Sequence, residues 1–443
     1  FGGSNILAVA DWFRSVDDRP VHYEGVYWDP RYPQTSDVVS QMYTPAAEVE
    51  RYLATHRDKP FVLCEYAHAM GNSFGAVDEY IELAYREPLF QGGFIWDFAD
   101  QAIARTDRHG VPFFGYGGDC GEAPHDGDFC GNGIFFADHT PTPKLQEVSY
   151  LYQGMRIRIG EGSFTVDNRL LDTATSAFRC VVTLARAGVV LRQVDIETDV
   201  AAQSRGEVPL PFGVPTAFGE YTVDVSFRLR SATAWAPAGH EMAREQTVWT
   251  VATPTAGVVT RMPAPELVVG GHNVGVHGPG FDVLFSTLYG GLASYRFGRT
   301  RDGGRELLRG MPKPSFWHAP TSNERGWEGP FEDGQWLLAS RYARVVDPLN
   351  STGVRVDGDG SVVVSYRYDL PTRPATSCDV AYRVDGAGRV DVTQVLHLVD
   401  GLPDLPEFGM LLAVDPDLDR LRWYGDGPEE TYVDRRGGAR VDV

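Results

Sequence analysis

The sequence has few cysteines, no excess of positive charge and no long apolar run. Its five cysteines are odd in number and never stand in a C-x-x-C spacing, which argues against a disulfide framework or structural zinc site and favours a reducing compartment. A formal net charge of −20 disfavours nucleic acid and anionic membranes as partners, because both repel an acidic protein. No run approaches the roughly eighteen apolar residues of a membrane-spanning helix, and no signal peptide is visible. These absences predict a cytoplasmic protein with neither kind of partner.

Length and composition predict several ordered domains. A chain of 443 residues exceeds what one ordinary core accommodates, which suggests about two to four domains. Hydrophobic residues make up 43% and charged residues 23%, and both shares are ordinary for ordered globular proteins. The first residues resemble the loop before a helix and the last resemble the middle of a sheet. We therefore expect the chain to be part of a longer polypeptide.

Residues 1–147 alternate helix and strand patterns. Strands that are nearly wholly apolar and alternate with helices indicate a parallel sheet covered on both faces. Four such strands are half of a (β/α)₈ barrel, so this region predicts the C-terminal half of a TIM barrel. The expected helices are Asn5–Ser15 with Asn5 as N-cap, Ala46–His56 and one around Val77–Ala84, and the expected strands centre on Tyr23, Met42, Leu63 and Phe94.

From residue 148 the pattern becomes all-β. Glu220–Leu229 alternates apolar and polar residues, which is typical of a half-buried antiparallel strand. Residues 148–252 therefore predict an immunoglobulin-like sandwich of the seven-strand type. The proline-bearing stretch 253–265 predicts a linker, and 266–443 repeats the β pattern without helices, as in a larger sandwich that is truncated. The predicted fold class is multidomain, α/β plus all-β.

Polar and aromatic side chains follow the expected strands of the first region. Glu24, Tyr43, Glu65 and Trp96 with Asp97 stand at the carboxyl ends, where a (β/α)₈ barrel carries its catalytic face. The aromatic residues suit the apolar face of a sugar ring. His68, Asn72 and Asp100 add polar groups, and no metal-ligand spacing or phosphate-binding glycine loop competes for this face.

These features predict glycoside hydrolysis by paired carboxylates, with Glu65 as one of the pair. Retention requires the two carboxyl groups to lie roughly 5–5.5 Å apart. The second carboxylate is left open, because Glu24, Asp97 and Asp100 each have an equally good structural interpretation. The roles of Asp119 and Asp126 are open as well, as loop anchors or substrate contacts.

Two other function classes deserve comparison. Gly71–Gly75 formally fits the G-x-S-x-G elbow of esterases. That elbow needs its serine at the tip of a strand, whereas here the expected strand ends at Glu65, eight residues before Ser73. A non-catalytic carbohydrate-binding or assembly module is the other alternative, since the β-sandwiches alone would permit it.

Several long motifs resemble one family. "LCEYAHAMGNS" and "QGGFIWDFADQ", with "RPVHYEG", "YGGDCGEAPHDGDFCGNGIFFADHTPTPKLQEV" and "WYGDGPEETYVDR", stand in the order and spacing of the large bacterial β-galactosidases of glycoside hydrolase family 2. The resemblance covers the whole chain and the middle-to-late part of such an enzyme.

The resemblance implies residue roles. Glu65 is similar to the nucleophile, and Tyr43 to the tyrosine that donates a hydrogen bond to it. His68 resembles the histidine that binds galactose hydroxyls, and Trp96 the platform under the sugar. Asn132 resembles the residue that ligates a monovalent cation, Na⁺ or K⁺, and contacts the sugar. The carbonyl of Phe129 resembles a second ligand of that cation.

The resemblance also implies a retaining β-galactosidase that hydrolyses terminal β-D-galactosides such as lactose, and a homo-oligomer when full length. The family's acid/base glutamate would fall just before Phe1, and its magnesium ligands further upstream. We therefore expect the isolated chain to be inactive. His125 stands where we expect asparagine, which predicts a different aglycone preference. Another family 2 β-glycosidase is an alternative.

Overall fold

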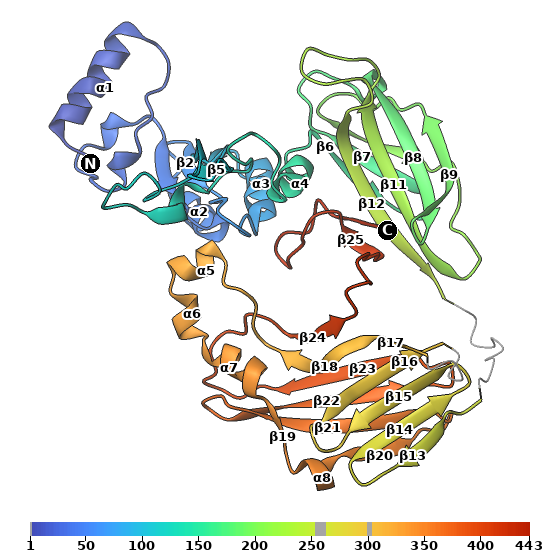
Figure 1. The fold of residues 1–443 in the computed structure, drawn as a ribbon. Helices are drawn as coiled ribbons and strands as arrows, with labels where there is room; N and C mark the ends of the chain where they lie inside the picture. The colour runs from blue at the N-terminus through green and yellow to red at the C-terminus, as the bar shows by residue number, and fades with distance from the viewer. Residues whose placement is uncertain (1, 253–262, 299–303) are drawn as a thin grey trace. The chain divides into compact units, whose positions relative to one another are not determined.

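The computed structural model describes residues 2–252, 263–298 and 304–443, which fall into two compact units (Figure 1). One unit comprises Phe1–Ala256 together with Arg422–Val443, and the other comprises Gly257–Leu421. The linker predicted at 253–265 lies mostly outside the described residues. None of the helices in the described ranges is long and apolar enough to cross a membrane. All predicted site residues lie in the first unit.

Residues 2–147 are built around a parallel sheet of order β1-β2-β3. In β2, Phe61 and Leu63 are fully buried and alternate with less buried residues, so the strand is anchored up to its carboxyl end. Among the described residues of this region the parallel sheet has three strands, where the sequence pattern predicted four. The elements are α1 (Ser4–Val16), β1 (Val39–Met42), α2 (Ala46–Leu53), β2 (Phe61–Tyr66), α3 (Val77–Arg86), β3 (Phe90–Ile95), the hairpin β4 (Ile103–Thr106) and β5 (Pro112–Gly115), and α4 (Lys144–Leu151).

The strand predicted around Tyr23 is wrong. A 3₁₀ turn, Glu24–Val26, begins at that point. Side chains bind the backbone that a neighbouring strand would have bound: Asp37 accepts from the Val21 amide at 2.7 Å, and Ser36 accepts from the Tyr23 amide at 3.1 Å. Side-chain hydrogen bonds of this kind compete with a sheet ladder.

Helix α1 begins differently from the prediction. Its N-cap is Gly3, with no side-chain cap, so the assignment of Asn5 as the cap is wrong. The glycine has a φ of 130°, a backbone conformation that side chains rarely permit. The Leu7 amide donates to its carbonyl at 3.2 Å. The N-cap therefore lies two residues earlier than predicted, and Asn5 falls inside the first turn of the helix.

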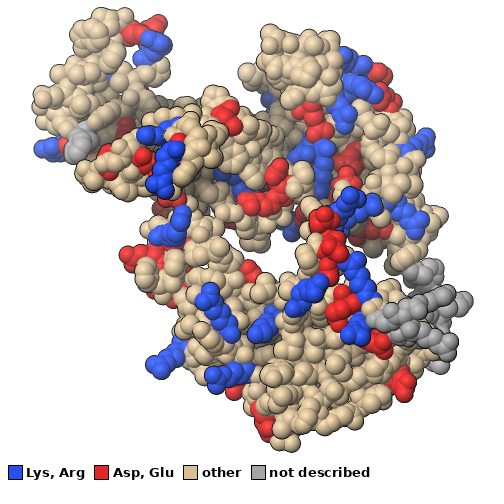
Figure 2. Space-filling model, in the orientation of Figure 1, with Lys and Arg blue, Asp and Glu red and all other residues tan. Residues whose placement is uncertain are grey.

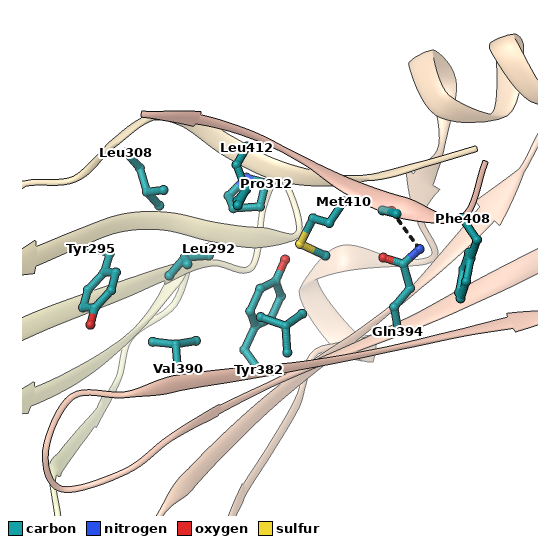
Figure 3. Close-up of a pocket in the computed structure, with 12 residues that line it drawn as sticks. Leu292, Tyr295, Leu308, Pro312, Tyr382, Val390, Gln394, Phe408, Met410 and Leu412 are labelled. Carbon is teal, nitrogen blue, oxygen red and sulfur yellow. Dashed lines mark hydrogen bonds between the residues drawn. The ribbon is translucent and has the colours of Figure 1, made fainter. Parts of the chain in front are cut away.

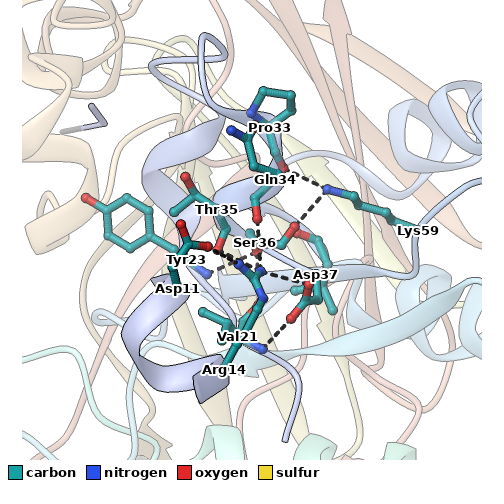
Figure 4. A network of polar contacts seen from close by, with 11 residues as sticks. Asp11, Arg14, Val21, Tyr23, Pro33, Gln34, Thr35, Ser36, Asp37 and Lys59 are labelled. Atoms are coloured by element: carbon teal, nitrogen blue, oxygen red, sulfur yellow. Dashed lines mark hydrogen bonds and ion pairs between the residues drawn. The ribbon is translucent and has the colours of Figure 1, made fainter. Parts of the chain in front are cut away.

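Polar contacts tie the end of α1 to the turn before β1 (Figure 4). Arg14 donates to the Gln34 carbonyl at 2.9 Å and to the Asp37 carboxylate at 2.8 Å. The backbone amide of Val21 holds the pKa of Asp37 below its usual value, with Arg14 adding to the effect. Lys59 on the other side donates to two carbonyls of the same turn at 2.7 Å each. The turn thus binds the positively charged side chains of Arg14 and Lys59, and these contacts hold the chain where β1 begins.

The sandwich predicted over 148–252 begins with the strand at Met155, because residues up to Leu151 belong to α4. One sheet has the order β10-β7-β6 and the other β12-β11-β8-β9. Phe164 and Val166 of the first sheet pack against Val223 and Phe227 of the second in one buried cluster. The strands are β6 (Met155–Ile159), β7 (Ser163–Asn168), β8 (Phe178–Arg186), β9 (Val189–Ile196), β10 (Ser204–Pro209), β11 (Gly219–Leu229) and β12 (Glu241–Val251).

The second unit packs two antiparallel sheets on a common core, with orders β13-β14-β15-β16-β17 and β19-β21-β22-β23. Phe285 and Tyr382 meet across it with ring centroids 5.4 Å apart. Short helices between 322 and 351 were not predicted. The elements are β13 (Glu266–Val269), β14 (Asn273–Gly278), β15 (Phe281–Ser286), β16 (Gly291–Phe297), β17 (Arg305–Glu306), β18 (Leu308–Ser315), α5 (Ser322–Gly326), α6 (Gly329–Glu332), α7 (Gln335–Tyr342), β19 (Arg344–Val345), α8 (Pro348–Ser351), β20 (Gly353–Val356), β21 (Val362–Leu370), β22 (Thr376–Val384), β23 (Val390–His397) and β24 (Gly409–Val414).

The C-terminal segment, residues 422–443, belongs to the first unit. The sequence pattern had predicted it to be part of the sandwich 266–443. It contains the pair β25 (Gly425–Gly427) and β26 (Arg440–Asp442). Hydrogen bonds join it to the sandwich: the Gln246 side chain accepts from the Val441 amide at 2.7 Å and donates to its carbonyl at 3.2 Å. Glu147 of α4 accepts from the Gly438 amide at 2.7 Å. The segment therefore bridges the sandwich and the α/β region.

Charged side chains of both signs are interspersed within each unit on the face shown in Figure 2. Acidic residues outnumber basic ones, sixty to forty, over the whole chain. On this face neither sign forms one continuous patch. The expectation that nucleic acid is no partner remains a prediction from the net charge.

Candidate active site

The site is organised by two hydrogen bonds between Tyr43 and Glu65. A register shift in the β1–β2 pairing sets Met42 opposite Glu65. The next residue, Tyr43, then donates its amide to the Glu65 carbonyl at 2.9 Å and its phenol to Glu65 Oε2 at 2.8 Å. Tyr43 has a φ of 53°, a conformation that costs free energy in a non-glycine residue and recurs at functional sites.

The Tyr43 hydroxyl keeps its proton and so remains a hydrogen-bond donor. Burial raises the pKa of Tyr43, and the hydrogen bond to Glu65 raises it further, because both disfavour the phenolate. The proton therefore stays on Tyr43 across the neutral range and fixes one oxygen of the Glu65 carboxylate. The structure places the side chains of Tyr43 and Glu65 in contact, and their catalytic roles stay predictions.

His68 completes an aromatic group beside this pair. Its ring lies 6.0 Å from that of Tyr43 in an edge arrangement and 5.7 Å from that of Phe129 in a stacked one. Burial lowers the pKa of His68, while the negative charges of Glu65 and Asp97 partly oppose the shift. A neutral imidazole can both donate and accept hydrogen bonds, which suits the hydroxyl groups of a sugar.

This shift predicts the pH behaviour of His68. We expect its imidazole to titrate below the ordinary histidine pKa of about 6.5, and Glu65→Gln to lower the pKa further by removing a favourable charge. Because the folded pKa is depressed, the contribution of His68 to folding stability is complete above the unfolded pKa and is lost as the pH falls through the folded pKa. NMR titration of histidine-labelled protein measures this, with His68→Gln assigning the resonance. Titration of His68 above the ordinary value would contradict the geometry.

Trp96 follows β3, and Asn132 holds it from behind. The Trp96 amide donates to the Tyr66 carbonyl at 3.1 Å. In the amide orientation that satisfies both neighbours, buried Asn132 accepts from the Trp96 indole Nε1 at 2.9 Å and donates to the Cys130 carbonyl at 3.2 Å. Its backbone carbonyl accepts from the Asp97 amide at 2.7 Å. Asn132 thus orients the Trp96 indole through its side chain and holds the backbone at Asp97 through its carbonyl.

Phe129 and Asn132 are the predicted ligands of a monovalent cation. Carbonyl and amide oxygens are the ligands that hard cations prefer. In the satisfied orientation, however, the Asn132 oxygen faces the indole N–H. Among the described residues no group of three His, Cys, Asp or Glu could hold a metal ion. The cation and magnesium sites therefore stay predictions.

Glu24 has a structural partner. The Cys64 thiol donates to its Oε2 at 3.1 Å. Burial raises the pKa of Cys64 to about 11, and the neighbouring Glu24 contributes to the increase. The thiol therefore keeps its proton at neutral pH, and this contact links Glu24 to the residue immediately before Glu65.

The remaining carboxylates also bind the chain itself. Asp97 accepts from the Gln101 side chain at 2.5 Å, while its buried Oδ1 has no partner among the described residues. The Asp100 carboxylate accepts from the Gly133 amide at 2.8 Å, and the Asp119 carboxylate accepts from the Tyr116 amide at 2.9 Å. Asp126 contributes its backbone instead, since its carbonyl accepts from the Phe129 amide at 3.3 Å. The negative charge of Asp97 raises the pKa of both Tyr43 and His68. Of these remaining carboxylates, Asp97 is therefore the one whose charge acts on the site.

Asn72 and Ser73 make contacts that the sequence did not predict. The Asn72 amide donates to the phenol of Tyr432 at 2.7 Å and to Glu430 at 3.2 Å. Ser73 Oγ donates to the His68 carbonyl at 2.5 Å. Sequence reasoning places Asn72 among the polar groups of the site and uses the motif "WYGDGPEETYVDR" for the family resemblance alone, with no role at this site. The motif itself was the available signal for these contacts, because it carries charged and aromatic residues far in sequence from any catalytic segment.

The second unit contains an apolar cavity of about 490 Å³ (Figure 3). Its polar groups are few: Gln394, which donates to the Gly409 carbonyl at 3.1 Å, and the phenols of Tyr295 and Tyr382. None of its lining residues is a carboxylate or a histidine. The cavity therefore lacks the pair of carboxylates that glycoside hydrolysis usually requires, and Glu65 with its neighbours remains the candidate active site.

Comparison with known families gives a consistent result. Three family models match in order: "Glycosyl hydrolases family 2, TIM barrel domain" over residues 1–157, "Beta-galactosidase, domain 4" over 164–250, and "Beta galactosidase small chain" over 277–443. The chain belongs to glycosyl hydrolase family 2. The family 2 barrel match contains every predicted site residue.

Curated relatives of this family 2 chain are named beta-galactosidase. It is 38% identical to that of Streptococcus thermophilus, over 99% of this chain and 44% of the relative. It is 38% identical to that of Halalkalibacterium halodurans, over 100% of this chain and 43% of the relative. It is 39% identical to Beta-galactosidase BgaC of Bifidobacterium adolescentis, over 95% and 40%. The chain thus spans less than half the length of these relatives.

Proposed function

We propose that the protein containing this chain is a retaining β-galactosidase that hydrolyses terminal β-D-galactosides such as lactose. The observation that carries the proposal is Glu65 at the carboxyl end of β2, with its carboxylate held by the phenol of Tyr43 at 2.8 Å. Family 2 membership and the names of the relatives support the sugar and the reaction class.

The proposed reaction is a double displacement. A Glu65 carboxylate oxygen attacks the anomeric carbon, the glycosidic C–O bond breaks, and the leaving oxygen takes a proton from an acid. Water then attacks the galactosyl ester, gives its proton to the same group, and Glu65 leaves as a carboxylate. Tyr43 holds one oxygen of Glu65 throughout and leaves the other free for attack.

The neighbouring residues would bind the sugar. His68, neutral and half-buried, would exchange hydrogen bonds with galactose hydroxyls, and the Trp96 indole would pack on the apolar face of the ring. A site built to hydrogen-bond one epimer leaves buried groups unpaired with the other, which would favour galactose over glucose. We also propose magnesium and a monovalent cation in the full-length enzyme, a homo-oligomeric state and a cytoplasmic location.

We further propose that the acid/base glutamate lies outside these 443 residues. The contacts of Glu24, Asp97 and Asp100 with the chain itself support this. The relatives, which are more than twice as long as the matched part, support it too. The second carboxylate would then come from polypeptide beyond this chain.

A mechanism-based trap tests the proposed function. We expect a 2-deoxy-2-fluoro-β-galactosyl fluoride to label the full-length protein on the peptide that contains Glu65, because the fluorine slows hydrolysis of the ester. Peptide mass spectrometry locates the label, and the glucosyl analogue is the matched control for the sugar. Preferential labelling by the glucosyl compound would indicate another family 2 β-glycosidase. Reversible galactoside binding without any label would indicate a carbohydrate-binding module.

A further inference from the structure

Arg435 of the C-terminal segment is buried against the loop that follows β2. Its side chain is 3% exposed. It donates to the Ser73 carbonyl at 3.0 Å and to Glu430 at 2.8 Å, and it lies over the Tyr432 ring at 5.1 Å. A buried guanidinium is costly unless it is paired and hydrogen-bonded. The arginine is thus committed to this one arrangement.

Further contacts hold the same loop, residues 68–76. The Asn72 amide is bound between Tyr432 and Glu430. The Asp434 carbonyl accepts from the Ala76 amide at 2.8 Å. A Cβ added to Gly75 would meet the Asp434 side chain at 1.8 Å, so the two segments approach more closely than a side chain would permit. Buried Lys144 of α4 donates to the Gly71 carbonyl at 3.0 Å.

The same loop is hydrogen-bonded to residues of the candidate site. Ser73, whose carbonyl Arg435 binds, donates its hydroxyl to the His68 carbonyl at 2.5 Å. The next residue along, Ala69, donates its amide to the Trp96 carbonyl at 2.8 Å. Two hydrogen bonds therefore connect the guanidinium to His68, and the loop backbone touches Trp96. The loop lacks helix or strand structure of its own between β2 and α3.

We propose that Arg435 is a positioning residue that fixes the loop 68–76, and with it His68, from a segment more than 350 positions away in sequence. The loop contact itself does not depend on the proposed function, whereas its kinetic consequence rests on it. Arg435 touches no reacting atom in this account. It acts through Ser73. The planar fork of arginine directs one nitrogen at the Ser73 carbonyl and another at the Glu430 carboxylate, whereas lysine would have to reach both acceptors from a single nitrogen.

Hydrogen exchange of the full-length protein without substrate tests the contact. We expect Arg435→Gln to accelerate exchange of loop peptides within 67–76, with peptides from β11 unchanged. Arg436→Gln is the matched control, because Arg436 is the adjacent arginine, is largely exposed and pairs only at the surface with Asp426. It should leave the loop unchanged. Unchanged loop exchange in Arg435→Gln would refute the contact whatever the enzyme does.

Steady-state kinetics test the consequence. We expect Arg435→Gln to lower kcat/KM for a nitrophenyl galactoside by up to about 10²-fold, as a misplacement of about 1 Å can do, mainly through KM. Arg435→Lys should recover part of the loss, and Arg436→Gln should match the parent. A loosened loop with parental kcat/KM would refute the positioning role.

Two further outcomes are also decisive. If the parent itself hydrolyses no galactoside, the proposed function fails, and the exchange data alone decide the contact. If Arg435→Gln does not fold, Tyr432→Phe replaces it, because that change removes only the hydroxyl group to which Asn72 donates. It should loosen the loop to a smaller degree, and an unaltered loop would count against the proposal.

Discussion

Replacing Glu65 by glutamine is expected to lower galactoside hydrolysis by the full-length protein at least about 10³-fold, since losing the nucleophile of a well-studied enzyme costs up to about 10⁶ in kcat. Glutamine keeps the shape and can still accept the Tyr43 hydrogen bond seen at 2.8 Å, but it forms no galactosyl ester. Initial rates on nitrophenyl galactoside measure the loss. Circular dichroism checks that the variant folds.

Azide separates a lost nucleophile from a damaged fold. In a Glu65→Ala variant, azide can occupy the space of the carboxylate, attack the anomeric carbon and release the aryl group, giving α-galactosyl azide. We expect turnover to rise with azide concentration and the product to have the α configuration, because a single displacement inverts. A variant that stays inactive with azide while remaining folded would count against Glu65 as the nucleophile.

Ser73→Ala is the matched control for the esterase alternative. The Ser73 hydroxyl donates to the His68 carbonyl at 2.5 Å, and one such bond contributes about 1 kcal/mol. Galactosidase activity should therefore remain within about tenfold of the parent. Loss of activity as complete as in Glu65→Gln would instead place the serine in the chemistry.

Sequence patterns predicted this site where local rules and tertiary packing agree. The apolar run of β2 buries Phe61 and Leu63 completely, so it indicated both the strand and the place where Glu65 emerges. Period and polarity suffice there, because a buried parallel strand has little alternative. The sandwich strands were predictable from a different pattern, because an antiparallel strand with one buried face alternates apolar and polar residues.

Prediction failed where side chains replace backbone partners. Around Tyr23, Ser36 and Asp37 bind amides that a strand would otherwise share, and no periodicity reveals such a contact. The docking of Arg435 on Ser73 was equally hidden, because it joins positions 362 apart in sequence. In both places the decisive interaction is non-local, and the sequence carried only residue types.

The chain 1–443 by itself is expected to hydrolyse nitrophenyl galactoside about 10²–10⁴-fold more slowly than the full-length protein, because a positioned acid contributes about that factor. The deficit should shrink for a dinitrophenyl galactoside, whose leaving group departs without a proton. A plot of rate against leaving-group acidity should therefore be steep for the chain and shallow for the full-length protein. The trap with a dinitrophenyl leaving group should still label Glu65, which shows that the nucleophile is competent.

A flat leaving-group plot would contradict this account. It would mean that the described residues contain their own acid, and Glu24→Gln and Asp97→Asn would then identify it. Asp97 is the stronger candidate in that case, because one of its oxygens is buried without a partner and its charge acts on both Tyr43 and His68. Glu24, bound to the Cys64 thiol at 3.1 Å, would have to leave that contact before it could donate a proton. Failure of the dinitrophenyl trap on a chain that hydrogen exchange shows to be folded would show instead that the missing polypeptide also completes the sugar site.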